Sequence, residues 1–300
     1  MTTDPGTIPP HALRRVIETA LEEDAPWGDV TSETLIPVEA TATATLGARE
    51  PGVLSGGAVF VAVMHAVDPS IQAVVHVADG THFAAGDVLA TVTGSARAVL
   101  RAERVALNLV QRMSGIASVT AAHVAAAAGT AARIVDTRKT TPGLRALERY
   151  AVRCGGGHNH RTSLSDAVLA KDNHLAVLLA GGIGIGDAIA QARQRLGHTV
   201  HVEVEVDRID QIEPVVAAGV DTIMLDNFTP DELVAGVGIV AGRALVEASG
   251  GVSLDTVAAI AATGVDVISV GALTHSARAL DLGLDIDVAV PEHVAVPVQD

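Results

Sequence analysis

The chain has 300 residues, 49% of them hydrophobic and 18% charged, which predicts a globular protein with a sizeable core and excludes a disordered one. Its net charge of -15 disfavours nucleic acid and anionic membranes as main partners, because both repel an acidic surface. Cys154 is the one cysteine, so no internal disulfide can form. With no secretory leader and no apolar run of the ~20 residues that span a bilayer, the sequence predicts a cytoplasmic protein.

The first 128 residues predict a mixture of helices and strands, from their apolar spacing and turn signals. Helices are expected over residues 11–24 and 57–67, and strands over 40–49, 72–76 and 88–93. An Ala-rich stretch over 97–128 predicts either one long helix or two in succession with a break at Ser114–Gly115. Residues 79–94 resemble a lipoyl or biotinyl carrier hairpin, but no lysine precedes Lys139, so we interpret this hairpin as scaffold.

From Arg133 onward, short β-branched runs alternate with Ala-rich helices, which is typical of βα units around a parallel sheet. Six strand ends are predicted, near Thr137, Lys171, Glu205, Asp226, Ser249 and Gly271. In an α/β barrel, residues at the carboxyl ends of the strands form the mouth of the active site. Six strands are fewer than eight, so either the barrel is incomplete or a strand escapes detection. The Pro-interrupted tail after Asp287 is expected to fray.

Basic residues are concentrated in one segment. Of the 20 lysines and arginines in the chain, eight lie between Arg133 and Lys171, against three acids. Arg145, Arg149 and Arg153 recur every four residues, and we interpret them as a solvated helix face. Four more fall at strand ends or in turns: Arg138, Lys139, Arg161 and Lys171. In an acidic chain, such a cluster indicates a pocket for a polyanion.

Carboxylates alternate with valines over residues 200–207, V-H-V-E-V-E-V-D. Strand periodicity places Glu203, Glu205 and Asp207 on one face, which must point into the barrel if the valines meet the helices. Glu203, the deepest, either serves function or forms a buried pair with an interior arginine. Glu205 lies at the height of Asp226, and two carboxylates there suit magnesium, ribose hydroxyls or a developing positive charge.

Glycines at the last two strand ends indicate a phosphate site. E-A-S-G-G ends at Gly251 and V-G-A-L-T-H at His275, and small residues there let backbone N–H groups approach a phosphate. His158 and His160 have a spacing that can bind metal, but no cysteine or carboxylate lies within two residues of them. We therefore expect His160 and Arg161 to face the anion pocket instead.

Two further motifs are discounted. Cys154 has no evident base near it in the sequence, so it is interpreted as small buried packing and not as a nucleophile. The G-G-I-G-I-G run over residues 181–186 looks like a dinucleotide fingerprint, but it follows a helical stretch and not a strand.

Eight motifs occur together and in order along the chain. They are E-R-V-A-L-N-L-V-Q-R-M-S-G-I-A, D-T-R-K-T-T-P-G-L-R, G-G-G-H-N-H-R, L-A-K-D-N-H, V-E-V-E-V-D, M-L-D-N-F, E-A-S-G-G and V-G-A-L-T-H. With them the chain resembles the quinolinate phosphoribosyltransferase family, the carboxylating nicotinate-nucleotide pyrophosphorylases of NAD biosynthesis, from about residue 11 to about residue 286. The resemblance implies transfer of a phosphoribosyl group from phosphoribosyl pyrophosphate to quinolinate with decarboxylation, and Mg²⁺ as cofactor. The products would be nicotinate mononucleotide, carbon dioxide and pyrophosphate.

The resemblance also implies a fold and an assembly. It implies an N-terminal α/β sandwich domain over residues 1–112 to which 278–290 return, an incomplete α/β barrel over 113–277, and a flexible tail over 291–300. It further implies a homodimer, with a higher oligomer left open, in which Arg104 reaches the active site of the partner subunit. Neighbouring Arg101 and Arg112 are the alternatives for that role.

Roles of single residues are carried over from the same resemblance. It implies that quinolinate is held by Arg138, Lys139, His160, Arg161 and Lys171, and that Arg104 and Thr137 also bind substrate. It implies phosphate contacts at Ser249, Gly250, Gly251, Gly271 and His275. Glu205 and Asp226 match acids at the ribose and at magnesium, directly or through water, and would stabilise positive charge at the anomeric carbon. Lys139 or Lys171 is hypothesised to screen the carbanion left by decarboxylation.

The sequence leaves three alternatives. A paralogue on the same scaffold, such as the molybdenum-transport-associated proteins, would act on another anionic base and should lack part of the dicarboxylate-binding set. A phosphate-binding barrel lyase or decarboxylase would use Lys171 as a Schiff base. A ligand-sensing or carrier module would rest on the hairpin over residues 79–94 alone.

Overall fold

The structure, a computed structural model, describes residues 5–291, apart from the side chains of Asp172 and Leu179. The chain forms two compact units. Unit 1 comprises residues 1–119, 141–156 and 277–300, and unit 2 comprises residues 120–140 and 157–276. Within the described part of the chain, no helix has both the length and the apolar character needed to cross a membrane.

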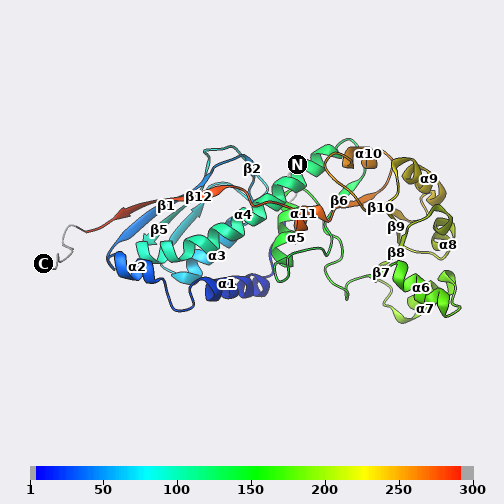
Figure 1. The fold of residues 1–300 in the computed structure, drawn as a ribbon, viewed down its shortest axis with the longest axis horizontal. Helices are drawn as coiled ribbons and strands as arrows, with labels where there is room; N and C mark the ends of the chain where they lie inside the picture. The colour runs from blue at the N-terminus through cyan, green and yellow to red at the C-terminus, as the bar shows by residue number, and fades with distance from the viewer. Residues whose placement is uncertain (1–4, 292–300) are drawn as a thin grey trace. The chain divides into compact units, whose positions relative to one another are not determined.

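Unit 1 is built on an antiparallel sheet with the strand order β12-β1-β5-β3. These strands are β12 (Leu282–Ala289), β1 (Thr41–Ala48), β5 (Val88–Ser95) and β3 (Gln72–Val75), and a small ribbon pairs β2 (Gly52–Val53) with β4 (His82–Phe83). Its helices are α1 (Pro10–Asp24), α2 (Val30–Leu35), α3 (Gly57–Val67), α5 (Arg145–Cys154) and the first part of α4 (Ala96–Ala126). The alternation of Thr and Ala in β1 buries Ala42, Ala44 and Leu46 on one face, and helices gather beside this sheet (Figure 1).

Helix α4 runs without interruption from Ala96 to Ala126, so the break considered at Ser114–Gly115 is absent. The glycine serves close packing instead. A Cβ atom at position 115 would overlap the carbonyl oxygen of Arg278, where the chain returns toward β12. The Ser114 hydroxyl accepts a hydrogen bond from the N–H of Ser55 at 3.1 Å, which ties the helix to the segment that precedes α3.

Unit 2 contains a parallel sheet with the strand order β6-β11-β10-β9-β8-β7. The strands are β6 (Arg133–Val135), β7 (Val168–Ala170), β8 (Val202–Val206), β9 (Thr222–Asp226), β10 (Leu245–Ser249) and β11 (Val267–Ser269). The first strand pairs with the last, as in a barrel, but no pairing joins β6 to β7 among residues 5–291. The barrel is therefore incomplete, and each of the six predicted strand ends lies within two residues of an observed one.

Helices connect the strands of unit 2 and lie on the outside of the curved sheet (Figure 1), except for the short helix at Ala272–His275, which follows the last strand. They are α6 (Asp172–Ala180), α7 (Ile185–Arg195), the short 3₁₀ helix η1 (Ile209–Gln211), α8 (Ile212–Ala217), α9 (Pro230–Val240), α10 (Val257–Ala261) and α11 (Ala272–His275). Val202, Val204 and Val206 of β8 are buried on the helix side, as the alternation with carboxylates predicts.

The unit boundaries differ in detail from the expected domain boundaries. Position 113 falls inside α4, and residues 141–156 belong to unit 1, although they were expected in the barrel domain. The reason is that α5 buries Leu147, Tyr150 and Ala151 and contacts α1. Strand β12 returns to unit 1 and pairs with β1, within the range 278–290. Except for Pro291, the tail expected over 291–300 lies outside the described residues.

The packing at Gly115 predicts a large effect of one methyl group. Gly115→Ala should lower the free energy of unfolding by about 1–3 kcal/mol, because the added Cβ overlaps backbone that cannot move freely. Gly238→Ala is the matched control: this glycine is exposed within α9 with open space around it, so alanine should add about 0.5–1 kcal/mol. Urea denaturation followed by circular dichroism measures both, and equal losses would contradict this account.

Candidate active site

A cavity of about 380 Å³ opens at the carboxyl ends of the strands of unit 2. It is lined by Thr137, Arg138, Lys139, His160, Arg161, Leu169, Lys171, Glu205, Met224, Asp226, Glu247, Ser249 and Ser269. Every strand of the sheet contributes a residue near its end, because parallel strands bring their carboxyl ends to the same edge. Segments far apart in the sequence thus meet in one polar pocket.

Nine residues expected at the site line this cavity, including all four cations Arg138, Lys139, Arg161 and Lys171. Sequence reasoning did not assign a role to Leu169, Met224, Glu247 or Ser269. The sequence does contain a signal for two of these four residues, Glu247 and Ser269. Glu247 lies two residues before Ser249, and Ser269 two before Gly271, so strand periodicity places each pair on one face.

The glycine loops beside the cavity have backbone geometry that larger residues would disturb. Gly250 has a positive φ of 88°, and a Cβ there would overlap the side chain of Asn227. A Cβ at Gly271 would approach the Lys139 side chain to 3.1 Å and the imidazole of His275 to 3.2 Å. The Thr274 hydroxyl donates to the Lys139 carbonyl at 2.8 Å, which joins α11 to the segment after β6.

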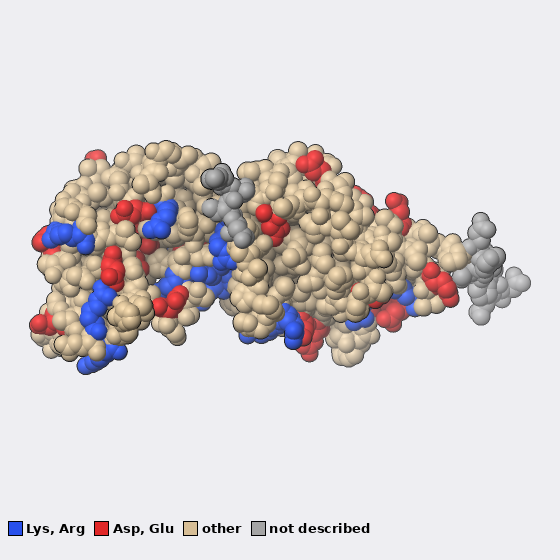
Figure 2. All heavy atoms as spheres, turned by 180° about the vertical axis from the view of Figure 1, so that it is seen from behind, with Lys and Arg blue, Asp and Glu red and all other residues tan. Residues whose placement is uncertain are grey.

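At the mouth of the cavity, cations and carboxylates face one another. Lys171 Nζ donates to Oε2 of Glu205, whose side chain is 13% exposed. Asp226 ends the neighbouring strand, and its Oδ2 accepts from the Asn227 amide at 2.7 Å. On the face drawn in Figure 2, basic and acidic side chains lie interspersed among uncharged surface. The cavity therefore stands out by the number of cations that it gathers.

The chemistry of Glu205 and Asp226 fits a magnesium ion. Both are carboxylates at the ends of adjacent strands, and both also line a second hollow beside the first. Mg²⁺ prefers oxygen ligands and commonly binds through one or two carboxylates together with substrate phosphates. These two side chains would be able to hold it, while the amine of Lys171 offsets the charge of Glu205 in the free protein.

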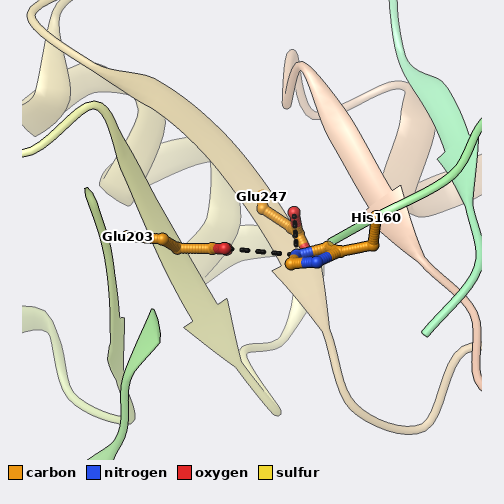
Figure 3. A group of neighbouring side chains, drawn as sticks. All are labelled: His160, Glu203 and Glu247. Carbon is orange, nitrogen blue, oxygen red and sulfur yellow. Dashed lines mark ion pairs between the residues drawn. The ribbon is translucent and has the colours of Figure 1, made fainter. Parts of the chain in front are cut away.

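Deeper in the barrel lies a group that we call the floor cluster: His160, Glu203 and Glu247. Figure 3 shows both carboxylates directed at the imidazole, with Glu203 on β8 and Glu247 on β10. Nε2 of His160 lies 3.2 Å from Oε2 of Glu203 and 3.5 Å from Oε2 of Glu247. Both glutamates are only 3% exposed. Glu203 thus pairs with a histidine, where an interior arginine was the alternative considered.

The floor cluster binds a proton tightly. Burial alone would lower the pKa of His160, but hydrogen bonds to Glu203 and Glu247 and their charges raise it to about 10. Burial also raises the pKa of Glu203. At neutral pH the ring is therefore protonated, and its Nε2–H points toward both carboxylates.

Two neighbours of the floor cluster differ from expectation. Asp207 was predicted to point into the barrel, but β8 ends at Val206 and the Asp207 side chain is 61% exposed beside Arg208. Its backbone N–H donates to Oε1 of Gln211 at 3.0 Å, which turns the chain outward. His158 is exposed and its N–H bonds the Ile134 carbonyl, so the two histidines of the H-x-H motif have separate environments.

The three candidate arginines of helix α4 have different surroundings within unit 1. Arg112 donates to Glu148 at 2.9 Å and to the Ala277 carbonyl at 2.7 Å, so it serves internal packing. Arg101 is half-buried; hydrogen bonds from Ser32 lower the pKa of Asp29, and the charge of Arg101 adds to this effect. The Arg104 side chain is exposed. Among these three, Arg104 has the accessible guanidinium.

Cys154 lies at the end of α5 and is buried in unit 1. Burial raises the pKa of its thiol to about 11, so the thiolate needed by a nucleophile is scarce at neutral pH. The structure therefore agrees with the interpretation of Cys154 as packing.

Comparison with known proteins identifies the family. Residues 29–114 match the family described as quinolinate phosphoribosyl transferase, N-terminal domain, and residues 116–285 match its C-terminal domain. The chain belongs to the quinolinate phosphoribosyltransferase family. Both matches run through the segments that build the two units and the cavity.

Individual relatives agree with this family. A nicotinate-nucleotide pyrophosphorylase [carboxylating] of Mycobacterium leprae is 44% identical over 281 residues, which cover 92% of this chain and 97% of the relative. A probable enzyme of the same name from Bacillus subtilis is 40% identical over 277 residues, covering 92% and 94%. The crystal structure of NadC from Streptococcus pyogenes superposes with a TM-score of 0.89 at 39% identity, covering 95% of this chain and 100% of that one. The family assignment therefore favours the transferase over the carrier and lyase interpretations.

Proposed function

We propose that the cavity of unit 2 is where this chain carries out the reaction of its family. The chain is a decarboxylating quinolinate phosphoribosyltransferase of NAD biosynthesis. It transfers the phosphoribosyl group of phosphoribosyl pyrophosphate to quinolinate and releases nicotinate mononucleotide, carbon dioxide and pyrophosphate. The observation that carries the placement is that two arginines and two lysines line one cavity in a chain of net charge -15.

Quinolinate suits this set of cations because it bears two adjacent carboxylates on a flat ring. Arg138 and Arg161 offer planar forks that match a carboxylate with two parallel hydrogen bonds. Lys139 and Lys171 are mobile point charges that can follow either carboxylate or a phosphate. Thr137 lines the same cavity and can add a hydroxyl contact. A monocarboxylate would leave some of these charges unmatched, which favours a dicarboxylate as the substrate.

The phosphate end of phosphoribosyl pyrophosphate is proposed to lie at the glycine loops. Gly250 and Gly251 both have positive φ angles, 88° and 61°, and follow Ser249 in the cavity lining. Such a backbone presents N–H groups to an anion without a side chain in the way. Gly271 and His275 are proposed to complete this region, because Gly271 packs against both Lys139 and His275.

Glu205 and Asp226 are proposed to act on the ribose side. As the bond to pyrophosphate breaks, positive charge develops at the anomeric carbon, and fixed carboxylates nearby stabilise it. The same two side chains would hold Mg²⁺, which when bound neutralises charge on the pyrophosphate. The pyridine nitrogen of quinolinate then forms the new bond to the anomeric carbon, and no covalent bond to the protein is needed.

Decarboxylation follows from the charge on the ring. Once the nitrogen is alkylated, the pyridinium accepts the electron pair left when the bond to the adjacent carboxylate breaks. Carbon dioxide leaves, and the ring carbon takes up a proton. Lys139 or Lys171 is proposed to screen the negative charge on that carbon, because these are the only lysines of the chain and both line the cavity.

We further propose that the protein works as a homodimer that shares its active sites. Arg104 supports this proposal because its guanidinium is exposed, whereas Arg112 is engaged with Glu148 and the Ala277 carbonyl. Trp27 and Val30 are 95% and 78% exposed, and large apolar side chains of this kind are often covered in an assembly. Arg104 would then add a cation to the partner's cavity.

The arginine fork can be tested while the charge is preserved. Arg138→Lys should raise KM for quinolinate about tenfold, equivalent to ~1.4 kcal/mol, because lysine cannot make two parallel bonds to a carboxylate. Affinity for benzene-1,2-dicarboxylate, which has the two carboxylates but no nitrogen nucleophile, should fall in parallel. Arg243→Lys is the control, since Arg243 also binds a carboxylate with its fork, at Glu213 on the surface. An unchanged KM in Arg138→Lys would refute this role.

Shared sites predict complementation between inactive subunits. Arg104→Ala and Arg138→Ala proteins should each lose most activity, but mixing and refolding them together should restore one intact site in every heterodimer. Activity is assayed after mixing, with each variant refolded alone as control. If Arg104 acts in its own subunit, each heterodimer contains only damaged sites and no activity returns.

A further inference from the structure

An ion pair between α4 and α5 of unit 1 takes no part in the proposed mechanism. Nη2 of Arg112 lies 2.9 Å from Oε1 of Glu148. The Glu148 side chain is 1% exposed and the Arg112 side chain is 24% exposed. A buried pair of opposite charges adds little stability relative to an apolar pair of the same volume, because both groups give up their water. What such a pair does fix is geometry, since each hydrogen bond requires a defined position of donor and acceptor.

Glu148 also holds the segment that follows β6. Its Oε2 accepts the backbone N–H of Thr141 at 3.1 Å. Thr141 comes two residues after Lys139 and three after Arg138, both of which line the cavity. A turn leaves little slack in between, because the N–H of Thr140 donates to the Arg138 carbonyl at 2.9 Å. The backbone that carries two of the cavity cations is therefore tied to Glu148 at its far end.

Arg112 holds a second segment, the one that follows α11. Its Nη1 donates to the Ala277 carbonyl at 2.7 Å. Ala277 comes two residues after His275, which is proposed to complete the phosphate region. Nη2 of Arg112 also donates to the Thr141 hydroxyl at 3.4 Å, so one guanidinium reaches both segments. The ion pair thus joins the backbone behind the dicarboxylate-binding cations to the backbone behind the phosphate region.

The same two segments also contact each other within unit 2. The buried Thr274 hydroxyl donates to the Lys139 carbonyl at 2.8 Å. A displacement of either segment would therefore disturb the other. Thr141 and Ala277 are the residues at which the chain returns from unit 2 to unit 1, so the ion pair holds the chain at both of these returns.

We propose that Arg112 and Glu148 are positioning residues for the transfer reaction, which act through the segments after β6 and α11. The ion pair sets how Arg138 and Lys139 are placed relative to His275. Two substrates that react with each other must be held with the reacting atoms about 3–3.5 Å apart, so the placement of their binding segments decides whether both are bound correctly. This inference rests on the proposed function for the identity of the two substrates.

The first test keeps the charge and changes the geometry. In Arg112→Lys, the single amine cannot bond Glu148 and the Ala277 carbonyl as the planar guanidinium does. KM for quinolinate and KM for phosphoribosyl pyrophosphate should both rise about fivefold, with kcat changed by less than about twofold, because each segment binds one substrate. Arg243→Lys, at the exposed pair with Glu213, is the control and should leave both KM values unchanged. If either KM stays unchanged in Arg112→Lys, the proposal is overturned.

The second test separates geometry from stability with the double variant Arg112→Met/Glu148→Leu. An apolar pair of similar volume should keep the melting temperature within about 3 °C of that of the natural protein. Both KM values should nevertheless stay raised about fivefold, since the segments have lost their anchors. Natural KM values in this variant would show that the pair only fills space and would overturn the proposal. If the double variant does not fold, Arg112→Lys decides the question alone.

A third measurement needs no substrate. In Arg112→Lys, the backbone amides of residues 137–144 and 271–277 should exchange hydrogen faster than in the natural protein, while those of α3 should not change. If both segments loosen but the natural protein does not turn over quinolinate, the proposed function fails and the positioning role stands. If the natural protein turns over quinolinate but neither segment loosens, the positioning role fails instead.

Discussion

The site depends on the balance of charge in one small cavity. Two unit charges 4 Å apart repel by ~1 kcal/mol in water and by ~4 kcal/mol near a protein surface, so four cations cannot line a cavity without compensation. The carboxylates of the same strand ends supply it. Lys171 forms an ion pair with Glu205 in the free protein. Asp226 of β9 and Glu247 of β10 also line the cavity. Carboxylates therefore offset part of the positive charge of the pocket in the free protein.

Depth in the barrel separates two kinds of carboxylate. Glu205 and Asp226 lie at the mouth, where both line the cavity and where the proposed mechanism places the developing charge. Glu203 and Glu247 lie below, are almost fully buried, and face only His160 among the contacts described. The alternation of a β-strand explains the division, because Glu203 and Glu205 share one face of β8 at different heights. One strand thus supplies a carboxylate at the mouth of the cavity and a buried one below it.

Local patterns predicted much of this arrangement. The six strand ends, the inward face of β8 and the cations at Arg138, Lys139, Arg161 and Lys171 follow from periodicity and composition within short segments. Contacts between segments that lie far apart in the sequence could not be predicted. The floor cluster joins His160 to Glu247 across the sheet, and no sequence pattern near either residue predicts that the two side chains meet. A break at Ser114–Gly115 was one of two alternatives because the packing partner of Gly115, the Arg278 backbone, is remote in sequence.

The direct test of the central claim is to follow both products of one reaction. Purified protein is given quinolinate, phosphoribosyl pyrophosphate and magnesium, and carbon dioxide and nicotinate mononucleotide are measured together, with nicotinate as substrate in a parallel reaction. The account predicts equal yields of the two products from quinolinate and no nucleotide from nicotinate. Folded protein that leaves quinolinate unchanged, or that makes nucleotide from nicotinate as readily, would contradict it.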